Sequence, residues 1–137
     1  RIFLPFGPGE APRRLIPSLI DVFAGKRAPF GVNAEACRDF LHASDVAEGF
    51  VALLHRGEGA FNISSGEPVR LANLVALLAE MLDADLRAVL DLPGGRPGEP
   101  SLLAGDNTKL KALGWDKRIA LRDGLQEMID EVRRKSP

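Results

Sequence analysis

The sequence predicts an α/β fold. Short apolar runs alternate along the chain with segments whose apolar residues repeat at helical spacing. The first such run, Arg1–Phe6, is largely apolar, which is typical of a parallel strand covered on both faces. Segments rich in glycine and proline separate the runs and mark loops. At 137 residues the chain has the size of one domain, so we treat residues 1–137 as a single unit.

The run Arg1–Phe6 also begins directly as a strand, with no methionine, tail or cap before it. A parallel strand covered on both faces needs neighbouring strands, and these are expected within the same protein. We therefore expect this chain to be the back part of a longer protein.

The composition limits the possible partners. A formal net charge of −1 gives no overall electrostatic basis for binding nucleic acid or a membrane surface, so neither is expected as a partner. The longest apolar runs fall well short of the ~20 residues that a membrane-spanning helix needs. Cys37 is the only cysteine, which excludes an internal disulfide and favours a reducing compartment such as the cytoplasm. His42 and His55 lack a carboxylate or cysteine at ligand spacing, so we expect no metal ligands.

A first helix is expected from about Ile16 to Gly25, after a loop rich in glycine and proline. Pro17 is tolerated only in a first helical turn, and Gly25 is a typical residue just past a helix end. Arg13 and Arg14 precede the helix, where they are either solvated surface charges or a pair that reaches a phosphate.

The stretch Arg38–Ala47 combines a charged pair, a short apolar strand and a helix start. Phe40–Leu41 forms the strand-like run. Ser44 and Asp45 both suit an N-cap, and Asp45 also fits a capping box with the glutamate three residues later. Arg38 comes directly before the buried-looking run, where a guanidinium needs a partner or a ligand.

Further helices and strands follow from the spacing of apolar residues. In the helix expected over Val46–Leu54, the positions at helical spacing are Val46, Phe50, Val51 (or Ala47) and Leu54. The remaining elements are expected in this order: a strand at Gly59–Gly66, a helix over Leu71–Leu82, an edge strand at Leu86–Leu90, a short helix over Asn107–Leu113 capped by Asp106, and a last helix over Leu121–Arg134. Trp115 is expected to cover an edge of the core.

Two irregular segments are candidates for ligand contact. In Ala28–Gly31, Phe30 is either a core aromatic residue or the flat wall of a nucleobase pocket. Asp91–Pro100 contains three prolines and three glycines, so it must be an exposed loop. Arg96 lies at its centre, flanked by residues that allow a backbone to approach a ligand closely.

Five segments match known motifs in a fixed order. They are Arg1–Gly9 for the pattern R-x-x-N-x-Y-G-P, Arg38–Ala47 for R-D-[FW]-[VIL]-x-V-x-D-V-A, Phe61–Val69 for a strand into N-[IV]-G-[ST]-G, Arg96–Glu99 for R-P-G-[DE], and Asp106–Trp115 for D-x-[ST]-K followed by L-G-W. Together they span almost the whole chain and resemble the nucleotide-sugar epimerase/dehydratase family, the extended branch of the short-chain dehydrogenase/reductases. Each motif alone is weak, but the five in this order are specific.

The resemblance implies a fold and a set of residue roles. The fold is the C-terminal lobe of such an enzyme, with the last strands of a doubly wound parallel sheet and a small substrate-binding α/β subdomain. This lobe binds a nucleoside-diphosphate sugar, while NAD or NADP is bound mainly by an N-terminal dinucleotide-binding domain that is absent from this chain. The implied contacts are Arg38 and Arg96 with the diphosphate or ribose, Pro29, Phe30 and Gly31 along the base, Glu99 with the ribose, Arg14 or Arg13 as added charge, and Phe3 near the nicotinamide.

Two departures from the family pattern affect the expected chemistry. Leu4 replaces the usual asparagine, which removes a polar contact to the substrate. The glycine fingerprint and the Tyr-x-x-x-Lys pair are missing, and the chain contains no tyrosine. It therefore lacks a proton relay to the sugar and a site for the cofactor pyrophosphate. We expect no catalytic residue in this chain and no turnover by it alone.

The resemblance implies that the full-length protein is a homodimeric enzyme that converts a nucleoside-diphosphate sugar through a transient keto-sugar. One alternative is a non-catalytic nucleotide-sugar or dinucleotide sensor of the same fold, which Leu4 favours. Another is an interaction module without a ligand, in which Arg38 and Arg96 would point to opposite faces. Arg38 could also form a surface salt bridge with Asp39.

Overall fold

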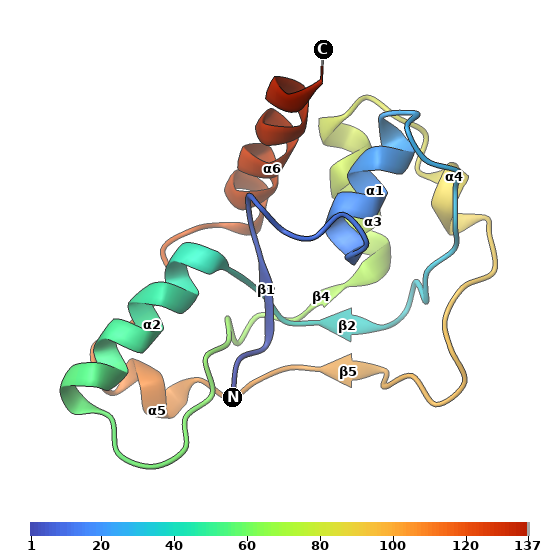
Figure 1. Cartoon of the computed structure of the whole chain (residues 1–137). Coiled ribbons are helices and arrows are strands. Elements are labelled where there is room, and N and C mark those ends of the chain that lie inside the picture. Colours follow the sequence, from blue (N-terminus) through green and yellow to red (C-terminus); the bar gives the residue numbers. More distant parts are fainter. Residues whose placement is uncertain (137) are drawn as a thin grey trace.

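The computed structural model describes residues 1–136 and has the alternating α/β architecture expected from the sequence (Figure 1). Its elements are β1 (Leu4–Phe6), α1 (Leu15–Phe23), β2 (Cys37–Arg38), β3 (Phe40–His42), α2 (Ala43–Arg56), β4 (Val69–Arg70), α3 (Leu71–Met81), α4 (Arg87–Leu90), β5 (Leu102–Leu103), α5 (Thr108–Lys111) and α6 (Leu121–Lys135). None of the helices in this described part is long and apolar enough to cross a membrane.

The strands form two small sheets. β1 and β3 pair in parallel, with Leu4 opposite Phe40 and Phe6 opposite His42. The second sheet has the order β4-β2-β5, in which β2 runs antiparallel to β4 and parallel to β5. The predicted fold class, an α/β lobe with parallel strands, is confirmed. The sequence did not predict β4 and β5, because strands of two residues leave no periodic pattern.

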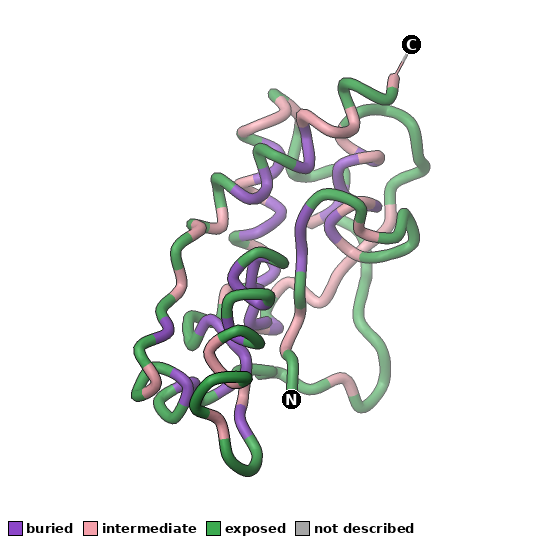
Figure 2. Tube along the Cα trace, turned by 60° about the vertical axis from the view of Figure 1, so that its left-hand side comes forward, coloured by how far each residue is buried: buried purple, intermediate pink, exposed green. Residues whose placement is uncertain are grey.

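The parallel pair β1–β3 separates two cores. Successive residues of a strand point to opposite faces, so Phe40 contributes to the first core and Leu41 to the second. The first core packs α1, α3 and α6 together, and the second lies under α2 and α5 and includes Trp115, as expected (Figure 1). Figure 2 shows that the buried stretches follow the helices and strands of the interior, whereas the outer loops are exposed.

Asp39 is the joint at which the chain leaves one sheet and enters the other. Its side chain is completely buried between β2 and β3. The carboxylate accepts hydrogen bonds from the backbone N–H groups of Ser65 (2.7 Å), Gly66 (3.0 Å) and Gly105 (3.1 Å). A buried carboxylate is stable only with such partners. The alternative of a surface salt bridge between Arg38 and Asp39 is therefore wrong.

The N-terminus of α2 differs from the prediction. His42 is the N-cap, and its Nδ1 atom accepts a hydrogen bond from the backbone N–H of Ser44 (3.3 Å). Asp45 instead lies buried within the first turn, where its carboxylate accepts two backbone N–H groups of the segment before α6. The predicted caps, Ser44 and Asp45, are wrong because a tertiary contact engages the carboxylate.

The apolar positions of α2 at helical spacing do not form a buried face. Only Val46 of the apolar positions at helical spacing is buried, whereas Phe50, Val51 and Leu54 are 47%, 46% and 83% exposed. These three side chains lie on one side of the helix, since Leu54 follows Val51 by three positions and Phe50 by four, and residues at these spacings are neighbours on a helix surface. An exposed cluster of large apolar side chains is typical of a surface that contacts another protein or domain.

The segment Leu86–Leu90 is not an edge strand as predicted. Residues Arg87–Leu90 form the short helix α4, and the Asp85 carboxylate accepts the backbone N–H of Arg87 (3.0 Å). Val89 is fully buried in the first core. An alternating pattern over five residues does not separate a strand from a single helical turn.

The other predicted elements largely agree with the structure. Three of the expected helices correspond to α1, α3 and α6, with ends shifted by one or two residues. α5 is shorter than expected, and its N-cap is Asn107, not Asp106 as predicted. Asp106, one residue earlier, accepts the backbone N–H of Thr108 (2.9 Å). The expected strand at Gly59–Gly66 is reduced to one parallel bridge between Ile63 and Ile2.

Candidate functional site

The candidate site is an open pocket of about 900 Å³. Its lining comes mainly from the stretch from β1 to the start of α1, the segment after α1, the β2–β3 region and the loop 93–100, and Leu71 of α3 and Leu103 of β5 also contribute. The lining residues used below are Leu4, Glu10, Arg14, Leu15, Phe30, Gly31, Arg38, Phe40, Arg96 and Glu99. The predicted loop and the predicted helix start therefore face one cavity, although about eighty positions separate Arg14 and Arg96 in the sequence.

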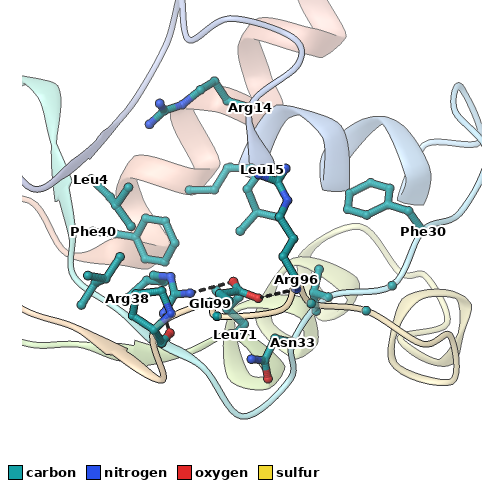
Figure 3. A pocket seen from close by; sticks show the side chains of 18 of the residues that line it. Leu4, Arg14, Leu15, Phe30, Asn33, Arg38, Phe40, Leu71, Arg96 and Glu99 are labelled. Carbon is teal, nitrogen blue, oxygen red and sulfur yellow. Dashed lines mark hydrogen bonds and ion pairs between the residues drawn. The ribbon is translucent and has the colours of Figure 1, made fainter.

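The pocket is elongated (Figure 3). Leu4 and Arg14 lie toward one end, and Phe30 lies at the other. Arg96 and Glu99 lie between these ends. Arg38 and Arg96 line the same cavity, so the arrangement expected for a module without a ligand, with the two arginines on opposite faces, does not occur.

Arg38 has the partner that its position requires. Its side chain is only 8% exposed, and Nη2 lies 2.7 Å from the Glu99 Oε1 atom. Nη1 donates to the backbone carbonyls of Cys37 and Pro100, both at 2.9 Å. These bonds fasten the end of the loop 93–100 to β2, so the guanidinium supports the pocket wall as well as lining it.

Glu99 connects the two arginines. While Oε1 accepts from Arg38, Oε2 accepts the backbone N–H of Arg96 at 3.2 Å. The Arg96 side chain is left exposed and extends across the pocket toward Leu15 (Figure 3). The site thus holds one buried, paired guanidinium and one exposed guanidinium that is available to an anion.

Phe30 and Gly31 form the other end of the pocket. Phe30 is half-buried, packs against the first core and also lines the cavity. A Cβ atom on Gly31 would lie 2.2 Å from the carbonyl oxygen of Pro93, because the two backbones cross there. Pro29 is exposed and is not among the lining residues.

Glu10 is a pocket residue that sequence reasoning missed. Its Oε1 atom accepts a hydrogen bond from Arg14 Nε (3.1 Å), and its Oε2 atom is buried with no hydrogen-bond partner among the described residues. Burial raises the pKa of Glu10 above its ordinary value, although the hydrogen bond and charge of Arg14 oppose this shift. The four-residue spacing of Glu10 and Arg14 is the only signal in the sequence that could have identified the pair.

Two other predicted site residues lie apart from the pocket lining. Phe3 packs beside Ser64 and Gly105, where a Cβ atom on Gly105 would approach the Phe3 ring within 2.7 Å. Arg13 is exposed and is not among the lining residues, whereas Arg14 is. Among residues 1–136, no three histidine, cysteine, aspartate or glutamate side chains converge as a metal site would require.

Solved structures of extended short-chain dehydrogenase/reductases share this fold, a short parallel pair between helices with a small mixed sheet beside the pocket. The chain superposes on MoeE5 in complex with UDP-glucuronic acid and NAD with a TM-score of 0.84 and 26% identity, over 99% of this chain and 46% of that one. It also superposes on RMD from Pseudomonas aeruginosa complexed with NADPH, with a TM-score of 0.84 and 26% identity, over 99% of this chain and 48% of that one.

The sequence comparison gives the family. The model for GDP-mannose 4,6-dehydratase matches residues 5–128, and the chain belongs to this family of NAD-dependent nucleotide-sugar epimerases and dehydratases. It is 34% identical over 133 residues to the putative GDP-L-fucose synthase 2 of Oryza sativa subsp. japonica. The matched region covers 90% of this chain and 37% of the rice protein. The chain therefore spans less than half the length of these relatives.

Proposed function

We propose that this chain is the substrate-binding part of an NAD- or NADP-dependent epimerase/dehydratase that converts a nucleoside-diphosphate sugar through a transient keto-sugar. The observation that carries the proposal is the elongated pocket, which places the exposed guanidinium of Arg96 between an aromatic end at Phe30 and a second end at Leu4 and Arg14. A nucleobase, a diphosphate and a sugar follow one another in the same order along such a ligand. The family membership supports this assignment.

Each predicted substrate contact has a role in this arrangement. Phe30 and Gly31, with Pro29 beside them, would bind the base, and Arg96 and Arg38 would neutralise the diphosphate through charge-assisted hydrogen bonds. Glu99 would orient both arginines and reach the ribose, and Arg14 would add positive charge. Phe3, outside the pocket, would face the nicotinamide.

The sequence of this chain lacks the glycine fingerprint that binds a dinucleotide. A pyrophosphate binds at a glycine-rich turn between a strand and a helix N-terminus. The turn between β1 and α1 instead carries the Glu10 carboxylate close to the helix start, which would repel a pyrophosphate. We therefore assign cofactor binding and the catalytic proton transfer to an N-terminal dinucleotide-binding domain, and we expect no turnover by residues 1–137 alone.

The N-terminal dinucleotide-binding domain would also cover the exposed apolar face of α2. Residues 1–137 alone are then expected to self-associate, because Phe50, Val51 and Leu54 have no other cover. Light scattering should show a smaller associated fraction for the double variant Phe50→Gln/Leu54→Gln, and no change for Glu48→Gln on the same helix. A clean monomer that melts cooperatively would contradict this domain assignment.

A charge reversal at Arg96 tests diphosphate binding. In the full-length protein, Arg96→Glu should weaken binding of a nucleoside diphosphate more than tenfold, because it replaces an attractive charge by a repulsive one. Binding of the nucleoside alone should change little in titration calorimetry. Arg87→Glu is the matched control, since Arg87 is exposed outside the pocket. Equal losses for nucleoside and nucleoside diphosphate would mean that Arg96 acts through the fold.

Turnover of a nucleoside-diphosphate sugar by the full-length protein distinguishes the enzyme from the non-catalytic sensor. We place the full-length enzyme in the cytoplasm and expect it to be a homodimer. Binding of nucleoside-diphosphate sugars without any turnover would favour the sensor.

A further inference from the structure

Glu10 is a largely buried charged group of the pocket, with one oxygen unpaired within residues 1–136. Its side chain is 13% exposed, and one carboxylate oxygen accepts a hydrogen bond from Arg14 while the other lacks a partner among the described residues. Burying an acceptor without a hydrogen-bond donor costs free energy. A ligand that supplies the donor removes this cost and gains a hydrogen bond. The terminal torsion of a glutamate is soft, so a rotation of the carboxylate can present this oxygen to the pocket.

The surroundings of Glu10 define which donor fits. Its end of the pocket also contains Leu4, Leu15 and Phe40, which are apolar, and Arg14, whose charge is already compensated by Glu10. A neutral hydroxyl group supplies the missing hydrogen bond without adding charge. The guanidinium of Arg96 extends toward Leu15 (Figure 3) but is engaged by the diphosphate in the proposed function. A second carboxylate would then face Glu10 without a free cation and would be repelled.

We propose that Glu10 is a specificity-determining residue that accepts a hydrogen bond from a hydroxyl group of the sugar and excludes uronic acids. The proposal rests on the proposed function, because it assigns the Glu10 end of the pocket to the sugar and the Phe30 end to the base. The substrate is then a nucleoside diphosphate that carries an uncharged hexose. Since MoeE5 is known in complex with UDP-glucuronic acid, the family fold itself does not impose this preference.

The test uses Glu10→Gln in the full-length protein. Glutamine keeps the shape of the side chain and an acceptor for Arg14, but it places an N–H donor where the unpaired oxygen stood. Glu58→Gln is the matched control, because Glu58 is exposed and outside this pocket. UDP, dTDP and GDP are titrated first, and the base that binds then selects the sugar pair, for example UDP-glucose with UDP-glucuronic acid or GDP-mannose with GDP-mannuronic acid.

The wild-type protein is expected to bind the hexose form roughly tenfold or more tightly than the uronic acid form. Glu10→Gln should weaken binding of the hexose form by roughly tenfold and narrow the difference in affinity between the hexose and uronic acid forms. Its affinity for the bare nucleoside diphosphate should be unchanged. Glu58→Gln should match the wild type in every titration. Unchanged nucleoside-diphosphate affinity also shows that the variant is folded.

Two results would overturn the proposal separately from the proposed function. The first is wild-type protein that binds both sugars equally. The second is a Glu10→Gln variant that keeps the wild-type ratio of hexose to nucleoside-diphosphate affinity, or that loses both affinities together. Failure of the wild-type protein to bind any of the three nucleoside diphosphates would overturn the proposed function and this inference together.

Discussion

Asp39→Ala is expected to lower the free energy of unfolding by about 3 kcal/mol or more, since each unsatisfied buried donor costs roughly 1–3 kcal/mol. The substitution leaves the backbone N–H groups of Ser65, Gly66 and Gly105 without their acceptor at a fully buried position. It also removes the hydrogen bonds that hold the chain where it passes from one sheet to the other. These hydrogen bonds position β2, and therefore Arg38 in the pocket.

Urea denaturation followed by circular dichroism measures this loss. Asp39→Asn should be less damaging, because the amide keeps one oxygen that can accept a backbone hydrogen bond. Asp123→Ala, at an exposed position in the first turn of α6, is the control for the removal of an aspartate. It should lower stability by no more than about 1 kcal/mol, the usual contribution of an acidic residue at a helix N-terminus. A loss below 1 kcal/mol for Asp39→Ala would show that water or a local rearrangement satisfies the freed donors.

Gly31→Ala is expected to abolish most of the nucleoside-diphosphate binding and to lower stability by about 2–3 kcal/mol. The added Cβ atom would lie 2.2 Å from the Pro93 carbonyl oxygen and 2.6 Å from that of Leu92, so one of the two crossing backbones must move. The displaced backbone leads directly into the loop that carries Arg96 and Glu99. The substitution therefore acts on both the base end and the middle of the pocket.

Gly98→Ala in the same loop is the matched control for this experiment. A Cβ atom there meets nothing within 4 Å, but the backbone has φ of +76°, so the substitution costs only about 1–2 kcal/mol of local strain. Calorimetric titration of the full-length protein should give a more than tenfold weaker affinity for Gly31→Ala than for Gly98→Ala. Similar affinities of the two variants would mean that the crossing does not shape the site.

The outcome for Arg38 shows how far sequence reasoning extends. A guanidinium before an apolar run requires a partner, and this requirement follows from the residue types alone. The partner is Glu99, 61 positions later, which the family resemblance had assigned to the ribose. The sequence left only Asp39 or a ligand as candidate partners, because Glu99 comes close to Arg38 only in the folded loop.

Two features of α2, its exposed apolar face and its N-cap, likewise depend on contacts between distant segments. In α2, the apolar residues repeat at helical spacing, but periodicity does not tell whether that face meets the core of this chain or another domain. Ser44 and Asp45 are good caps by residue type, yet the Asp45 carboxylate is engaged by the distant segment before α6. Local preferences are worth only a few tenths of a kcal/mol to about 1 kcal/mol, so tertiary contacts readily override them.

The sequence by itself determined the α/β class, the long helices and the position of the exposed loop at Asp91–Pro100, because these depend on periodicity and on the backbone properties of glycine and proline. Only the tertiary structure decided that Arg38 is paired with Glu99, that Asp39 joins the two sheets, and that Glu10 enters the pocket with one oxygen unpaired. Burial and long-range hydrogen bonding depend on which distant segments meet, and that information is absent from local residue patterns.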